Sequence, residues 1–242
     1  MTVIRNLDLP LDREQILLRL ERGGFRPVPR IINLAEKLLE IFSGLVEPSF
    51  VYEVIPGKGH NSKKVPISIP LPVGLRPASQ IALVVATIGP GLEKKVAECF
   101  AQKEATRALI LDRIGNTAVG LLQKRAFEFI KDEVVPPGFM AANPLKPGGL
   151  CWHISAQQSI FKLVSPEQIG VSLSSGATML PRKSGSMAIG ISAGGVDGTP
   201  PAVCTRCKMG RGCAFRTQTV DSKNGEIVGV PYRSTLNEER TT

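Results

Sequence analysis

The sequence predicts an α+β protein in which helices and strands are mixed within one large domain. Three observations support this fold class. Apolar residues recur at helical spacing in several stretches, β-branched or alternating residues form others, and glycine and proline separate the two kinds. With 242 residues, 43% of them hydrophobic, the chain can bury a substantial core. We expect one domain over residues 1–220 and a polar C-terminal tail over residues 221–242.

Helices and strands alternate in the predicted first part of the chain. Asp12 can cap the first helix, because an aspartate before an apolar periodic stretch accepts hydrogen bonds from free N–H groups. Pro29 suits the first turn of the second helix, where its missing N–H is no loss. We expect helices over residues 12–23 and 29–44, and strands over 49–55, 65–71 and 81–87.

The continuous apolar run Ile81–Thr87 predicts a strand that is buried on both faces. A Gly-Pro-Gly turn and a helix over residues 92–104 follow it. The turn lacks the spacing of a phosphate-binding loop, so we interpret it as a simple connection. Leu92, Val96, Cys99 and Phe100 share one face of this helix, which predicts that Cys99 is a core thiol and not a metal ligand.

A long helix or helix pair is predicted over residues 106–133, with Leu109 among its apolar positions. It contains Gly115 and Gly120, and glycine destabilises a helix interior by roughly 0.5–1 kcal/mol relative to alanine. We therefore expect a neighbouring element to pack closely at these glycines. After it we expect a shaped ligand loop without regular structure over 135–153, a helix over 155–163, and strands over 169–173 and 186–191.

Cysteines are concentrated in the stretch CTRCKMGRGCAFR, from Cys204 to Arg216. Cys204, Cys207 and Cys213 have the spacing C-x2-C-x5-C, which lets their thiolates converge on one soft metal ion or cluster. A disulfide with a spare thiol and cysteines that only fill space are the alternatives. Because a segment rich in Gly, Lys and Arg offers little core to fill, we predict an iron–sulfur cluster, with zinc as the alternative metal.

Three sulfurs leave one coordination position unassigned, and Cys151 is the candidate for it. Cys99 is excluded by its helical face. Either Cys151 completes a four-sulfur site, or the centre keeps an open position for an exogenous ligand. We predict the first arrangement.

The chain is basic, with a formal net charge of +9, and its charge is unevenly distributed. Between residues 134 and 220 the only acidic residues are Glu167 and Asp197. Such a segment can attract an anionic ligand or an acidic protein partner. Nucleic acid is not expected, because aromatic residues make up only 5% of the chain and no helix-turn-helix or RNA-binding pattern occurs. The bases of this segment are Lys146, Lys162, Arg182, Lys183, Arg206, Lys208, Arg211 and Arg216.

A cytoplasmic location without a membrane partner is expected. The N-terminal residues lack the order of a secretory signal, and the apolar run at 81–88 is too short to span a bilayer. In a reducing compartment, clustered cysteines favour metal binding or redox chemistry over structural disulfides.

Three separated segments resemble the activation domain of vitamin B12-dependent methionine synthase, and especially its small free-standing relatives. They are LDRIGNTAVG at 111–120, LKPGGLCWHISAQQSIFKLVSPEQIGVSLS at 145–174, and TMLPRKSGSMAIGI at 178–191. Those relatives often carry a cysteine-rich end followed by an aromatic-Arg pair, which Phe215-Arg216 matches. The resemblance covers roughly half the chain, and the order of the segments makes it specific.

This resemblance implies a mixed α/β domain with a curved, mainly antiparallel sheet. In that family the domain binds S-adenosylmethionine while the cobalt of cobalamin is reduced and remethylated, and irreversible methylation draws the unfavourable reduction forward. Lys146-Pro147-Gly148 matches a Ser-Pro-Gly turn beside the methyl donor, and Ser174-Ser175 match a Thr-Glu pair. The ligand-binding residues expected on this basis are Lys146, Pro147, Gly148, Gly149, Trp152, Ser174, Ser175 and Arg182.

The chain departs from the family at three positions of this expected site. Pro144 stands in place of an arginine, Gly149 in place of a tyrosine, and Ser175 in place of a glutamate. The arginine and the glutamate each provide a charge-assisted hydrogen bond worth roughly 1.5–3 kcal/mol. We expect S-adenosylmethionine to lack these contacts here.

The leading hypothesis is an accessory protein that activates or repairs a corrinoid protein or a cobalamin-dependent methyltransferase. The cysteine-bound centre would pass an electron from a donor protein, and cobalamin would lie on the partner. One alternative is an iron–sulfur or zinc protein that acts in electron transfer or assembly without corrinoid chemistry. Another is an S-adenosylmethionine-dependent methyltransferase, for which Cys151 and His153 are the nearest reactive pair. We interpret His153 as a partly buried residue beside Trp152.

Overall fold

The computed structural model describes residues 1–57, 71–149, 152–193, 218–220 and 227–229. The chain forms two compact units, Met1–Thr199 and Pro200–Thr242. The expected domain boundary at residue 220 stays a prediction. In the second unit, β8 (Gln218–Val220) pairs antiparallel with β9 (Ile227–Gly229). All further elements belong to the first unit.

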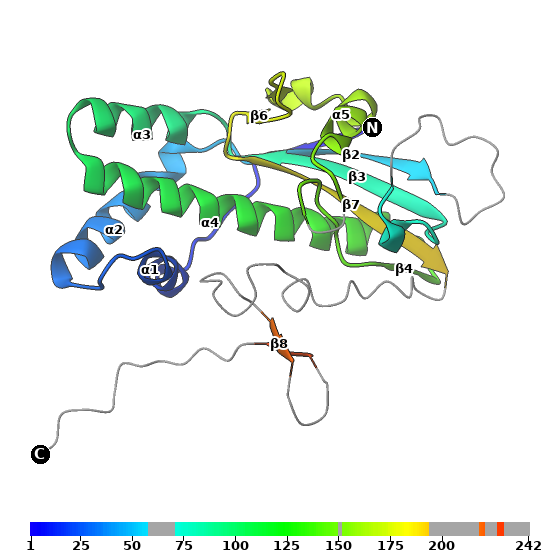
Figure 1. The fold of residues 1–242 in the computed structure, drawn as a ribbon, viewed down its shortest axis with the longest axis horizontal. Coiled ribbons are helices and arrows are strands. Elements are labelled where there is room, and N and C mark those ends of the chain that lie inside the picture. Colours follow the sequence, from blue (N-terminus) through cyan, green and yellow to red (C-terminus); the bar gives the residue numbers. More distant parts are fainter. Residues whose placement is uncertain (58–70, 150–151, 194–217, 221–226, 230–242) are drawn as a thin grey trace, which may run out of the picture. The chain divides into compact units, whose positions relative to one another are not determined.

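A five-stranded sheet in the order β1-β2-β3-β7-β4 forms the centre of the first unit (Figure 1). Each neighbouring pair in it is antiparallel. The curved antiparallel sheet with its helices confirms the predicted α+β class. The elements of this unit are β1 (Thr2–Arg5), α1 (Arg13–Arg22), α2 (Pro29–Phe42), β2 (Ser49–Pro56), β3 (Gln80–Thr87), α3 (Gly91–Ala101), α4 (Ala105–Phe129), β4 (Phe139–Ala141), α5 (Ala156–Val164), β5 (Ser172–Leu173), β6 (Met179–Leu180) and β7 (Ser184–Ala193), with short helical turns at Ser43–Leu45, Val73–Leu75, Ile130–Val134 and Pro166–Ile169.

The two faces of the sheet belong to two separate cores. Ala82 and Val84 of β3 pack in the core that α1, α2 and α4 cover. Leu83 and Val85 point to the opposite face, where α5 and the segment around Trp152 cover them. Figure 1 shows α4 along one face and α5 over the other. Because β3 is covered on both sides, its residues are apolar without interruption, which confirms the predicted doubly buried strand.

Both predicted N-terminal helices are confirmed, because their boundaries depend on local chemistry. Asp12 accepts hydrogen bonds from the backbone N–H groups of Glu14 (3.2 Å) and Gln15 (3.4 Å). Gly23 caps the C-terminus of this helix. Pro29 is the first residue of α2. The expected strand over 65–71 falls almost entirely outside the described residues.

The predicted long helix is one continuous helix, α4, which ends in a π-helical turn over Ile130–Val134. Gly115 meets the expectation of close packing, because a Cβ atom there would lie 2.8 Å from Leu92 Cδ2. The same expectation is wrong for Gly120. A Cβ atom at Gly120 would meet nothing within 4 Å, since this glycine lies on the exposed side of the helix.

Individual side chains on α3 and α4 divide between core and surface. Cys99 is 1% exposed, which confirms a core thiol. Phe100 and Leu109, which were expected to pack inward, are 48% and 47% exposed. Phe100 follows Cys99 directly, so helical geometry turns its side chain about 100° away from the buried one.

Two expectations for the region after α4 are wrong. Residues 135–153 contain regular structure, because β4 pairs with β7 and Leu145 forms an isolated antiparallel bridge with Ala188. The strand expected over 169–173 is shorter, since Pro166–Ile169 forms a 3-10 helix and only Ser172–Leu173 is a strand. The strand expected over 186–191 is confirmed as β7.

No helix in the described ranges is long and apolar enough to cross a membrane.

Candidate functional site

The residues Leu145–Gly149, here called the Lys146 turn, leave the edge of the sheet in a tight reversal. Leu145 exchanges two backbone hydrogen bonds with Ala188 of β7, at 2.9 and 2.8 Å. The Gly149 N–H then donates to the Lys146 carbonyl oxygen at 3.0 Å. Pro147 at the second position and Gly148 at the third, with a φ of +82°, are the residues that a type II turn requires. The Lys-Pro-Gly-Gly sequence therefore determines the turn locally.

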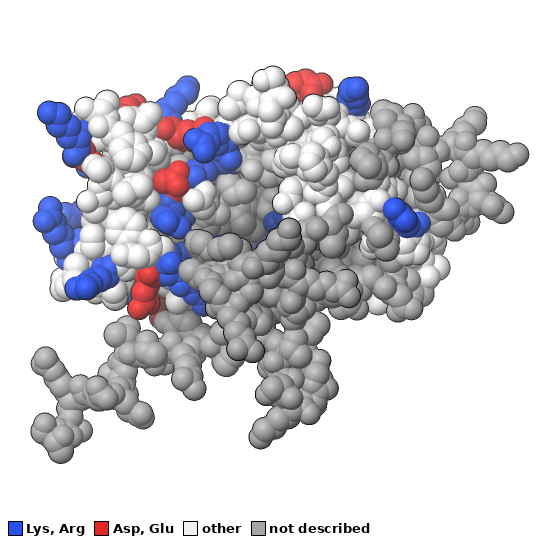
Figure 2. Space-filling view, in the orientation of Figure 1, with Lys and Arg blue, Asp and Glu red and all other residues white. Residues whose placement is uncertain are grey.

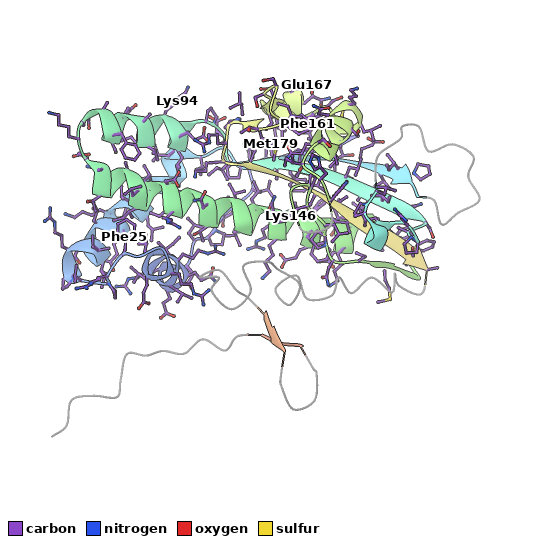
Figure 3. All side chains as sticks on the ribbon, in the orientation of Figure 1. Phe25, Lys94, Lys146, Phe161, Glu167 and Met179 are labelled. Carbon is purple, nitrogen blue, oxygen red and sulfur yellow. The ribbon has the colours of Figure 1, made fainter. Side chains whose placement is uncertain are left out.

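The side chain of Lys146 is held by α4. Its Nζ donates a hydrogen bond to Gln123 Oε1 at 2.5 Å, and Figure 3 labels Lys146 near the C-terminal half of that helix. Lys146 as a whole residue is exposed, but this contact is partly buried. Burial of the ammonium group lowers the pKa of Lys146 below its ordinary value. The turn thus places a positive charge, fixed by one neutral acceptor, at the edge of the sheet.

Gln123 is itself fixed between the turn and β7. It is 8% exposed. A Cβ atom on Gly185 would lie 1.8 Å from Gln123 Nε2, so only glycine at this position of β7 leaves room for the amide. The amide of Gln123 therefore fills the space above Gly185 and presents its oxygen to Lys146.

Trp152 and His153 follow the turn and lie in different environments. The Gly148 N–H donates to the Trp152 carbonyl oxygen at 2.9 Å, which ties the two segments together. Trp152 is 4% exposed and packs in the core on the α5 side of the sheet. His153 is exposed, contrary to the interpretation that it is partly buried. Its Nδ1 lies 2.8 Å from Ser155 Oγ and accepts from the Ser155 N–H, so it orders the start of α5.

Ser174 and Ser175 lie at the tip of the hairpin that β5 and β6 form. Ser174 Oγ accepts a hydrogen bond from the Thr178 N–H at 3.1 Å, and this contact closes the hairpin loop. Ser175 is exposed. The hydroxyl of Ser174 is thus used within the loop.

Arg182 is exposed and precedes the buried Lys183. Lys183 pairs with Asp112 on α4, where its Nζ donates to Asp112 Oδ1 at 2.6 Å. Arg182 and Lys183 contribute to the lining of a cavity of about 560 Å³ beside α3 and α4.

The expected ligand-binding residues therefore form three groups. The first is the Lys146 turn with Trp152, the second is the hairpin tip with Ser174 and Ser175, and the third is Arg182 beside α3. In the described part of the chain, no hydrogen bond or ion pair joins Lys146, Ser174 and Arg182 to one another. Their common role in one ligand site stays a prediction.

The expected metal ligands Cys151, Cys204, Cys207 and Cys213 all lie outside the described residues. Among the residues that are described, no group of three or more His, Cys, Asp or Glu side chains could hold a metal ion. The metal site therefore stays a prediction from the cysteine spacing.

Comparison with known proteins gives a structural relative. The chain resembles the crystal structure of the MetH reactivation domain bound to AdoHcy, with a TM-score of 0.59. The fold is similar to that of a reactivation domain. Sequence identity is 13%, and the similarity covers 84% of this chain and 81% of that chain. No protein-family model matches the chain, and no curated protein matches it in sequence.

This structural relative supports a distant similarity in fold between this chain and the reactivation domain. The segments that suggested it occupy neighbouring elements of the first unit. Residues 111–120 lie on α4, residues 145–149 form the Lys146 turn, and residues 178–191 cover β6 and most of β7. In the structure α4 contacts β7, whereas α5, which belongs to the second segment, packs in the core on the opposite face, so the three segments lie on both sides of the sheet.

Sequence reasoning missed the polar residues of α4 that hold the two lysines. Asp112, Asn116 and Gln123 follow one another at spacings of four and seven residues, which places them on one face of the helix. This face receives Lys183 near its start and Lys146 near its end. This row of polar residues on one face of the helix was the pattern that could have revealed them.

Proposed function

We propose that this protein is an accessory protein for the reductive activation or repair of a corrinoid-dependent methyltransferase. The observation that carries the proposal is the similarity to the MetH reactivation domain over 84% of the chain. The order of the three resembling segments supports it. The partner would be a corrinoid protein or a cobalamin-dependent methyltransferase, and the cobalamin would be bound to that partner.

The Lys146 turn is the proposed place of an S-adenosyl ligand. The structural relative was crystallised with AdoHcy, and the turn has the Pro-Gly geometry that the family places beside the methyl donor. Lys146 brings a positive charge to this place, and like charges repel, so the turn is less favourable for a sulfonium than for an uncharged thioether. Titration calorimetry with S-adenosylmethionine distinguishes the accessory role from the methyltransferase alternative. Micromolar affinity for S-adenosylmethionine together with methyl transfer to a substrate other than cobalamin would favour the methyltransferase alternative.

The proposed cysteine centre would add electron transfer to this function. Cys204, Cys207, Cys213 and Cys151 are the proposed ligands, and an iron–sulfur cluster on them would supply one-electron chemistry. Zinc has no redox chemistry of its own. Elemental analysis and electron paramagnetic resonance of protein purified without oxygen would show iron and a reducible cluster.

A matched pair of substitutions sharpens this measurement. Cys207→Ser is expected to lose the metal, because it removes a ligand from the C-x2-C pair. Cys151→Ser is expected to lose it as well if Cys151 completes the site, whereas full metal content in that variant would indicate an open position. Zinc as the sole metal in the unaltered protein would remove the electron-transfer role.

Complex formation with a corrinoid protein tests the proposal itself. The purified protein and a corrinoid protein in its cob(II) form are expected to form a complex in sedimentation velocity experiments. An acidic partner surface would make this complex weaker at high salt, since screening shortens the range of charge attraction. If no complex forms at low salt with any of several corrinoid proteins, the scaffold alternative without corrinoid chemistry is favoured.

A further inference from the structure

A second polar cluster lies on the same face of α4 as Gln123, but nearer the start of the helix. It is centred on Lys183 and includes Asp112 and Asn116. Asp112 precedes Gln123 by eleven residues, and a rise of 1.5 Å per residue separates them by roughly 16 Å along the helix axis. This cluster is therefore distinct from the Lys146 turn.

The cluster is built from side chains whose positions are fixed by hydrogen bonds. The Lys183 side chain is 9% exposed, and its Nζ donates to Asp112 Oδ1 at 2.6 Å and to Asn116 Oδ1 at 2.7 Å. Asn116 Nδ2 donates in turn to Asp112 Oδ2 at 3.2 Å. The backbone N–H of Lys183 donates to Glu93 Oε1 at 2.6 Å, which brings in α3. Two helices, α3 and α4, therefore converge on one residue.

Local packing explains how the lysine reaches this position. A Cβ atom on Gly115 would lie 3.2 Å from Lys183 Cε and 2.8 Å from Leu92 Cδ2. The glycine thus leaves room for the lysine stem between α3 and α4. Ser184 anchors the next residue of the chain, because its Oγ donates to the Pro181 carbonyl oxygen at 2.7 Å and lies 2.8 Å from Thr87 Oγ1.

A cavity of about 560 Å³ opens beside this cluster. Its volume lies within the range of small-molecule sites, roughly 300–1,000 Å³. Figure 2 shows side chains of both charge signs mixed over this helical part of the surface. The residues that line the cavity are Glu93, Val96, Asp112, Asn116, Arg182 and Lys183.

The charges in the cavity do not all neutralise one another directly. Lys183 and Asp112 form an ion pair. Among the described residues, the guanidinium of Arg182 has no hydrogen-bonding or charged partner, and Glu93 uses only Oε1. One cation and one carboxylate oxygen therefore remain to receive a ligand, and Val96 adds an apolar wall.

We infer that this cavity binds a small zwitterion, an α-amino acid with an apolar side chain. Arg182 would receive the carboxylate, Glu93 would receive the ammonium group, and Val96 would contact the side chain. A purely anionic ligand such as phosphate would meet the carboxylates of Glu93 and Asp112. A purely cationic ligand would meet Arg182 and Lys183. A ligand that carries both charges satisfies both sides of the cavity.

Binding experiments with defined ligands test this inference. Titration calorimetry of the full chain is run with L-alanine, L-valine, L-leucine and L-methionine, and with an amine and a carboxylic acid that each carry the leucine side chain. At least one amino acid is expected to bind. The matching amine and acid are expected to bind at least about tenfold more weakly, because each lacks one charge-assisted contact.

Substitutions at the surface of the cavity locate the binding. Arg182→Gln and Glu93→Gln are each expected to weaken amino-acid binding at least about tenfold. Lys94→Gln is the matched control, since it removes a positive charge from an exposed residue of α3 that does not line the cavity. It is expected to leave the affinity unchanged, and circular dichroism checks that each variant is folded.

Three outcomes would overturn the inference. They are no binding of any of these amino acids up to about 10 mM, equal binding of the amine or the acid, and binding that Arg182→Gln and Glu93→Gln leave unchanged in folded protein. None of these measurements involves a corrinoid partner, so this inference and the proposed function can fail independently.

Discussion

Lys146 is the residue at which the sequence and the structure agree most closely. The Pro-Gly pair after it predicts a turn, and the structure has that turn with a φ of +82° at Gly148. The partner of its ammonium group could not be predicted. Gln123 precedes Lys146 by 23 residues, and only tertiary packing brings the two together. Lys146, which was expected as a ligand-binding residue, is therefore held in place by a partly buried contact with α4.

The lowered pKa of Lys146 gives a prediction for stability as a function of pH. The unfolded chain holds its proton up to the ordinary value of 10.5, whereas the folded protein releases it at lower pH. Between the two values the unfolded state binds more protons, so the free energy of unfolding contributed by Lys146 rises with pH in that window. Below the window this contribution is at its least favourable.

Urea unfolding of the unaltered protein and of Lys146→Met, from neutral pH to pH 10.5, measures this contribution. The difference in free energy of unfolding is expected to shift in favour of the unaltered protein as pH rises. A difference that is constant up to pH 10.5 would show that Lys146 titrates as it does in the unfolded chain.

At the scale of elements, α4 is the helix on which both lysines depend. Its boundaries were predicted from apolar periodicity, since every turn carries residues for the core. Short strands were predicted poorly, since β4 was expected to be loop and β5 covers only part of the strand expected over 169–173. β4 has three residues and β5 has two, and such segments are stabilised by pairing with a distant strand and not by their own pattern.

Two glycines on α4 and β7 provide a matched test of the packing around Gln123. Gly185→Ala is expected to destabilise the protein by about 1–3 kcal/mol, because the new methyl group displaces the Gln123 amide that lies against this glycine. Gly120→Ala is expected to stabilise it by about 0.5–1 kcal/mol, because nothing lies within 4 Å and alanine favours a helix interior. Denaturant unfolding of both variants measures the two effects.

The decisive result is whether each substitution raises or lowers the free energy of unfolding. Gly185→Ala with unchanged stability would show that Gln123 moves without cost and is not held between Lys146 and β7. Nuclear magnetic resonance of the Gln123 side-chain amide is expected to show a shift in Gly185→Ala and none in Gly120→Ala.

For the whole molecule, the fold class followed from the sequence because long periodic helices and a doubly buried strand dominate the first unit. Only part of the candidate site could be predicted from the sequence. Residues 145–149 form the predicted turn, while Ser174 uses its hydroxyl to close a hairpin loop and Trp152 fills a core. Sequence spacing identifies residues that can act together, but it does not say which of them the fold uses for its own hydrogen bonds.

The rate of corrinoid remethylation tests the proposed function most directly. A corrinoid protein in its cob(II) form is mixed with a reductant and S-adenosylmethionine, and visible absorption follows the formation of the methylated form. Addition of the protein is expected to accelerate this conversion. Gly148→Ala is expected to reduce the acceleration about tenfold, because a side chain at a φ of +82° costs about 1–2 kcal/mol and distorts the ligand turn, and Lys94→Gln is expected to leave it unchanged. A rate that is the same with and without the folded, metal-loaded protein would contradict the proposed function.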